Sequence, residues 1–111
     1  MKIVYIAHPI GGDIEKNIKK VLEICRKVNL QTSDIVPFVP YLSDLYCLDD
    51  NSPEERERGL QNGFFMLKKG FIDEIWLYGD RISNGMRAEI NICKQVGVKI
   101  VPKTSETLKE L

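Results

Sequence analysis

The sequence predicts a single α/β domain built on a doubly wound, parallel sheet of four to five strands. Two observations indicate this class. Short apolar runs, typical of buried strands, alternate along the chain with longer segments whose apolar residues recur at helical spacing. The length of 111 residues suits one hydrophobic core and is short for two, so residues 1–111 are expected to form one domain.

The N-terminal segment predicts a strand followed by a helix. Residues 3–7 form a continuous apolar run, as in a strand that is buried on both faces of a parallel sheet. Asp13 is a suitable N-cap for a helix over residues 14–28. Its apolar stripe is expected to pack on the sheet and consists of Ile14, Ile18, Val21, Leu22, Cys25 and Val28.

The middle of the chain predicts a weaker strand, a long loop and a second helix. Residues 34–37 are the strand, and Pro37 and Pro40 frame the loop that follows it. Residues 38–51 have no clear period, and a loop of this length is expected to be functional, as a lid over a site. Ser52 then begins a strong helix start, with proline next and glutamate three residues on.

The second helix is expected to run to about Lys69 and to end at a glycine. The C-terminal part then predicts a third strand over 74–78, a helix over 85–96 and a fourth strand over 98–101. A short helix is expected from Ser105.

Alternation of strands and helices favours right-handed crossovers and the strand order 2-1-3-4, with helices on both faces, as in flavodoxin- or Rossmann-like folds. The chain reverses direction between the first and third strands, where ligands bind beyond the carboxyl ends of the strands. Residues 8–12 and 79–85 follow those two strands, so we expect them to share one cleft.

Glu89 is the candidate catalytic residue. On a helical wheel it falls between Cys93 and Val96, on or beside the buried stripe that Met86 and Cys93 share. A carboxylate there is costly unless it is paired, while the helix dipole favours its ionised form. This is what a nucleophile or general base needs. The alternative is a first-turn glutamate that only stabilises its helix.

The two loops hold the candidate ligand contacts. Backbone N–H groups at a helix N-terminus can bind phosphate, although many such turns use glycine for geometry alone. Neither a dinucleotide fingerprint nor a Walker loop is present. The predicted substrate-binding residues are His8, Pro9, Gly11, Gly12, Gly79, Asp80, Ser83, Asn84, Gly85 and Met86.

His8 and Tyr5 each have an alternative interpretation. His8, the only histidine, is read as a ligand contact, and the alternative is a histidine bonded to neighbouring backbone. Tyr5 is expected to orient a cleft carboxylate through its hydroxyl, or else to be an ordinary core tyrosine. Arg56 and Arg58 lie on a polar helix face and are expected to be solvated, with anion binding by Arg58 as the alternative.

The composition argues against several classes of partner. Sixteen basic and sixteen acidic residues are well mixed, so neither a nucleic acid polymer nor a membrane surface is an expected partner. No apolar run approaches a membrane span, and no signal peptide is seen. The three widely spaced cysteines indicate reduced thiols, which favours a cytoplasmic location. No metal spacing is present, and no cofactor is expected.

Three segments together give the chain a family resemblance. Residues 5–12 (YIAHPIGG), residues 73–76 (DEIW), and residues 83–86 (SNGM) followed by Glu89 resemble the nucleoside 2-deoxyribosyltransferase superfamily. The resemblance is to its small, poorly characterised bacterial and phage branch and spans about residues 3–101. It implies that Glu89 attacks C1′ of a 2′-deoxynucleoside and that Tyr5 positions it.

The resemblance also bears on the ligand. The serine at position 83 resembles the one found there in the branch that hydrolyses deoxynucleoside monophosphates. This resemblance implies that Ser83 contacts a 5′-phosphate. The chain departs from the family at residues 62–66, where no second carboxylate is present to assist the leaving base. That role would fall to Asn62, to Asp44, Asp49 or Asp50, or to no residue. His8-Pro9 also replaces a more usual Gly-Ser or Gly-Pro.

The leading hypothesis is therefore an enzyme that cleaves or exchanges at the N-glycosidic bond of a (deoxy)nucleoside 5′-monophosphate. The alternative is a non-catalytic module that senses or sequesters a nucleotide, and a third possibility is a scaffold with a vestigial cleft. The resemblance implies a homodimer or higher homo-oligomer. Gly59 and Gly63, together with Tyr41 or Tyr46, are candidates for the contact between subunits.

Overall fold

A computed structural model describes residues 1–111 and contains one four-stranded, all-parallel sheet. The strands are β1 (Lys2–Ala7), β2 (Ile35–Phe38), β3 (Glu74–Leu77) and β4 (Lys99–Pro102). The helices are α1 (Ile14–Gln31), α2 (Tyr41–Cys47), α3 (Pro53–Lys68), α4 (Asn84–Val96) and α5 (Ser105–Glu110). The strand order β2-β1-β3-β4 confirms the predicted topology.

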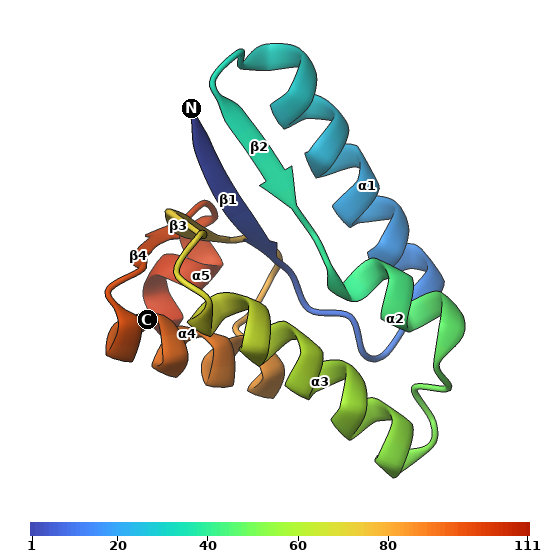
Figure 1. Cartoon of the computed structure of the whole chain (residues 1–111). Helices are drawn as coiled ribbons and strands as arrows, with labels where there is room; N and C mark the ends of the chain where they lie inside the picture. The colour runs from blue at the N-terminus through green and yellow to red at the C-terminus, as the bar shows by residue number, and fades with distance from the viewer.

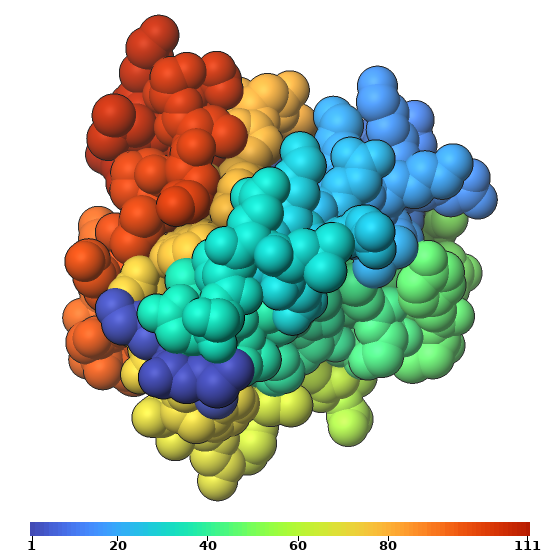
Figure 2. Space-filling model, turned by 90° about the horizontal axis from the view of Figure 1, so that it is seen from above, coloured from blue at the N-terminus to red at the C-terminus, as the bar shows by residue number.

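Helices cover both faces of this sheet. Figure 1 shows α1 alongside β1 and β2 on one side, with α3 and α4 packed side by side on the other. In Figure 2 the start of β1 (dark blue) lies between β2 (teal) and the yellow residues that lead into β3. β1 and β3 are therefore the two central strands, and the chain reverses direction between them.

The main core lies between the sheet and the pair α3 and α4. It forms because alternate residues of β1 and β3 point to this side and meet the apolar stripe of α4. The buried cluster consists of Tyr5, Ala7, Leu67, Ile72, Ile75, Leu77, Ile82, Met86, Ile90, Cys93 and Val98. Tyr5 and Glu89 thus lie on the side of the sheet that carries most of the buried apolar surface.

Side-chain caps begin four of the five helices. Asp13, Ser52, Ser83 and Thr104 each accept a hydrogen bond from a backbone N–H of the first turn that follows. The first two caps are the predicted ones, and Ser83 starts α4 one residue earlier than expected. Because such a cap satisfies an otherwise unpaired N–H, each contributes about 1 kcal/mol.

Residues 38–51 differ from the prediction, because they contain α2 rather than an irregular lid. This helix has seven residues, and Pro40 at its N-cap offers no side-chain hydrogen bond. Tertiary contacts hold it instead. The ring of Tyr41 packs 5.8 Å from that of Tyr5, and its hydroxyl donates a hydrogen bond to the carbonyl of Ile6.

Asp73 and Glu74 stand at the end of the sheet that lies away from the carboxyl ends of the strands, and their contacts are structural. The Asp73 carboxylate accepts a hydrogen bond from the N–H of Ile3, and Glu74 pairs with Lys2 at 2.7 Å. None of the helices has the length and hydropathy needed to cross a bilayer.

Candidate active site

A cleft of about 460 Å³ opens at the carboxyl ends of β1 and β3, where the chain reverses direction. Its walls come from the loops that follow these strands and from α2, α3 and the first turns of α4. This is the position that a doubly wound sheet predicts for a ligand.

Eight of the twelve predicted site residues line this cleft: Tyr5, His8, Gly11, Ser83, Asn84, Gly85, Met86 and Glu89. The other four, Pro9, Gly12, Gly79 and Asp80, lie outside the lining. Pro9 is fully buried against Gly79, so these two residues shape the loops. The Asp80 carboxylate is highly exposed and pairs with Arg81.

Tyr5 and Glu89 form the central contact of the site. The Tyr5 hydroxyl on β1 donates a hydrogen bond to Oε2 of Glu89 on α4. The tyrosine is 1 % exposed, and Glu89 is partly buried and lines the cleft. The sheet therefore fixes a tyrosine beneath a carboxylate that remains accessible to a ligand.

The surroundings of Glu89 favour its protonated form. Burial raises the pKa of its carboxyl from 4.5 to about 7, while the hydrogen bond from Tyr5 acts in the opposite direction. Burial also raises the pKa of Tyr5 well above 10, and the Glu89 charge adds to that shift. Tyr5 is therefore a donor at neutral pH. Burial outweighs the helix dipole that was expected to keep Glu89 ionised, so this carboxyl group titrates near neutrality, where it can act as a base.

The contact requires a bare surface on α3. A Cβ at Gly63 would lie 3.4 Å from the Tyr5 hydroxyl, which is the edge of ordinary van der Waals contact. One turn earlier, a Cβ at Gly59 would lie 3.6 Å from Cβ of Asp44. The glycine pair therefore leaves room for packing inside the chain.

His8 lines the cleft and is also bonded to neighbouring backbone. Its ring lines the cleft and is 8 % exposed, and Nδ1 lies 2.6 Å from the carbonyl oxygen of Pro9. Because a carbonyl only accepts, Nδ1 carries the proton and donates, which leaves Nε2 as an acceptor in the neutral ring. Burial lowers the pKa of His8 and thereby favours this neutral form.

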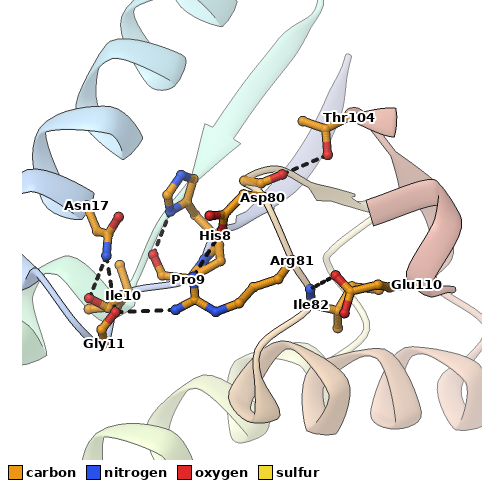
Figure 3. Close-up of polar contacts among 11 residues, drawn as sticks. His8, Pro9, Ile10, Gly11, Asn17, Asp80, Arg81, Ile82, Thr104 and Glu110 are labelled. Carbon is orange, nitrogen blue, oxygen red and sulfur yellow. Dashed lines mark hydrogen bonds and ion pairs between the residues drawn. The ribbon is translucent and has the colours of Figure 1, made fainter. Parts of the chain in front are cut away.

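The two ligand loops are tied to each other and to α5 (Figure 3). Arg81 bridges them, since its guanidinium contacts the Asp80 carboxylate at 3.0 Å and the carbonyl of Gly11 at 3.4 Å. From α5, the Glu110 carboxylate accepts the N–H of Ile82 at 3.0 Å. These bonds fix the backbone that leads into α4 and hence the place of Ser83.

α2 and α3 contribute residues to the cleft that were not among the predicted site residues. Four residues at helical spacing all line the cleft: Tyr41, Asp44 and Leu45 on α2, and Leu48 at its C-cap. On α3, Arg56 lines the cleft, whereas the Arg58 side chain donates to Asn62 at 3.1 Å. Arg56 therefore takes the position that the alternative interpretation gave to Arg58. A period of three and four residues in 41–48 was the available signal for α2.

The cleft holds three further carboxylates, on Asp44, Asp50 and Glu55. None of them is among the groups that shift the pKa of Glu89. No three His, Cys, Asp or Glu side chains come together as a metal site would require. Of the four carboxylates in the cleft, Glu89 is the one that accepts a hydrogen bond from Tyr5.

Comparison with known protein families assigns the chain to one family. A family model described as Domain of unknown function (DUF7768) matches residues 2–103, and the chain belongs to this family. The match covers all four strands and both loops of the cleft. No curated protein matches the chain significantly.

Proposed function

We propose that this DUF7768 protein cleaves or transfers at the N-glycosidic bond of a (deoxy)nucleoside 5′-monophosphate, with Glu89 as the nucleophile. One observation carries the proposal: a carboxylate with a pKa of about 7 lies in a cleft of about 460 Å³ and is held by a buried tyrosine. The motif resemblance to nucleoside 2-deoxyribosyltransferases supports the same chemistry.

The reaction follows the logic of retaining glycosidases. Ionised Glu89 attacks C1′ as the bond from C1′ to the base nitrogen breaks, and the base leaves with that electron pair and takes a proton from solvent water. The enzyme then carries the sugar as an ester of Glu89, which water or a second base resolves. The Tyr5 hydroxyl fixes the carboxylate for attack, and neither step requires a metal or a cofactor.

The phosphate is assigned to the N-terminus of α4. Ser83, Asn84 and Gly85 line the cleft there, and the unpaired N–H groups of a first turn attract anions. Arg56 and Arg81 add two positive charges to the lining. His8 and Gly11 border the same space and would contact the sugar or its phosphate.

The test is release of free base. Protein is incubated with each 2′-deoxynucleoside and each 5′-monophosphate, and free base is followed by chromatography. Release that prefers the monophosphates, vanishes in Glu89→Gln and persists in Glu57→Gln on the exposed face of α3 supports the proposal. Absence of release from every substrate would reject it.

A nucleotide-binding module is the second candidate. It is favoured by Asn62, which stands where the resemblance would place an acid, and by the lack of a carboxylate in contact with Glu89. In that case nucleotides would raise the melting temperature without any release of base.

The protein is also proposed to act as a homodimer or higher oligomer in the cytoplasm. Tyr46, which is 73 % exposed on α2, is the most exposed of the sequence candidates for the subunit contact, which also include Tyr41 and the Gly59/Gly63 strip. The three cysteines are free thiols, as a reducing compartment would keep them. Light scattering that finds only monomer at micromolar concentration would overturn the oligomer.

A further inference from the structure

Asp44 and the contact between Tyr5 and Glu89 lie against the same face of α3. Gly59 leaves room for Cβ of Asp44, and Gly63 leaves room for the Tyr5 hydroxyl. Glycines four residues apart are separated by one helical turn, or about 6 Å. Asp44 therefore lies against the turn of α3 next to the one that faces the hydroxyl holding Glu89.

A hydrogen-bonded chain holds the Asp44 carboxylate in this place. Arg58 donates to Oδ1 of Asn62 at 3.1 Å, which directs the amide nitrogen of Asn62 to the opposite side. That nitrogen lies 3.4 Å from both carboxylate oxygens of Asp44. The contact orients Asp44 and leaves its oxygens with further capacity to accept.

The other carboxylates of the cleft differ from Asp44. Glu55 accepts the N–H of Asp49 at 3.0 Å and so caps the chain before α3. The Asp50 carboxylate has no hydrogen-bond partner that would orient it. Asp44 is thus the one further carboxylate in the lining that neighbouring side chains orient.

We propose that Asp44 is the general base for hydrolysis of the sugar ester on Glu89, an inference that rests on the proposed function. Water attacks C1′, the bond from C1′ to the Glu89 oxygen breaks, and its electron pair returns to the carboxylate. The proton lost by the water passes to Asp44 and then to solvent. A retaining reaction requires such a base on a second carboxylate.

Water is a weak nucleophile until it loses a proton, so the role of Asp44 is most direct when water is the acceptor.

The test compares Asp44→Asn with Asp50→Asn, which makes the same change elsewhere in the cleft. Base and sugar phosphate are each followed over time, with deoxynucleoside 5′-monophosphates as substrates. Asp44→Asn is expected to release about one base per active site and then to turn over at least 100-fold more slowly than the native protein. Sodium azide, which attacks C1′ without losing a proton, is expected to restore turnover and yield the glycosyl azide.

Two results would overturn the role of Asp44. One is hydrolysis by Asp44→Asn at the rate of Asp50→Asn. The other is slow turnover without an initial release of base and without recovery in azide, which would show a structural defect. If the native protein releases no base from any nucleotide, the proposed function itself fails, and the role of Asp44 falls with it.

Discussion

The Tyr5 hydroxyl donates a hydrogen bond to the Glu89 carboxylate, although 84 residues separate the two in sequence. β1 and α4 bring them together because β1 and β3 are neighbours and α4 follows β3 on the same side of the sheet as the Tyr5 ring. Burial and this single donor have opposite effects on the pKa of Glu89. The balance between them leads to the following predictions.

Base release is expected to rise with pH through about 7, because Glu89 attacks only when it is ionised. Tyr5→Phe removes the donor that lowers the pKa of Glu89, so the rise moves to higher pH. At pH 6 the rate should fall roughly tenfold, since a hydrogen bond to a charged group contributes about 1.5 kcal/mol or more. The measurement is the pH profile of base release.

Tyr41→Phe is the matched control for that profile. Its hydroxyl donates to the Ile6 carbonyl rather than to Glu89, so the midpoint of the profile should stay where it is in the native protein. An equal shift in both variants would show that the packing of the tyrosine rings, and not the hydrogen bond, sets the pKa of Glu89.

Glu89→Gln is expected to stabilise the fold above neutral pH. The pKa of Glu89 is about 7 when folded and 4.5 in its ordinary state, so the unfolded chain loses the proton first as pH rises. Native stability therefore falls between about pH 4.5 and 7, by up to about 3 kcal/mol. Glutamine stays neutral and avoids this loss.

Urea unfolding at pH 4 and pH 8 measures the difference. Glu89→Gln should match the native protein at pH 4 and exceed it at pH 8, whereas Glu57→Gln, on the exposed face of α3, should differ by less than about 0.5 kcal/mol at both. A variant that is less stable than the native protein at pH 8 would contradict the assigned pKa.

Ser83→Ala is expected to remove the preference for a 5′-phosphate. The serine caps α4 at 3.2 Å and lines the cleft, so its loss should cost about 1 kcal/mol of stability and also weaken monophosphate binding. Ser52→Ala loses the comparable cap of α3, at 3.4 Å and outside the cleft lining. The ratio of kcat/KM for monophosphate over nucleoside should fall in the first variant alone.

The sequence predicts the strands, helices and loops around the site because local sequence signals determine them. Caps at Asp13 and Ser52 determine where two helices begin, and the apolar runs determine the strands. Once the strand order follows, the loops after β1 and β3 must meet. The position of Glu89 beside the buried stripe of α4 was likewise readable from its spacing to Cys93.

The rest depends on tertiary contacts that no short pattern encodes. α2 forms without a side-chain cap because Tyr41 packs on Tyr5, and this contact spans 36 residues. The role of Gly59 and Gly63 in admitting Asp44 and Tyr5 is visible only when those partners are in place. Pro9 and Gly79 are predicted ligand contacts because they lie in the two loops that follow β1 and β3. In the structure they pack against each other.

The contact between Gly79 and Pro9 gives a final prediction about the shape of the cleft. Gly79 has φ +97°, and a Cβ there would lie 2.5 Å from Cδ of Pro9. Gly79→Ala should therefore combine backbone strain with overpacking and destabilise the fold by roughly 3 kcal/mol or more. Gly70→Ala has a similar φ of +86° and open space around its Cβ, so it should cost only about 1 kcal/mol. Urea unfolding of both variants measures the difference, and equal costs would show that Pro9 moves aside.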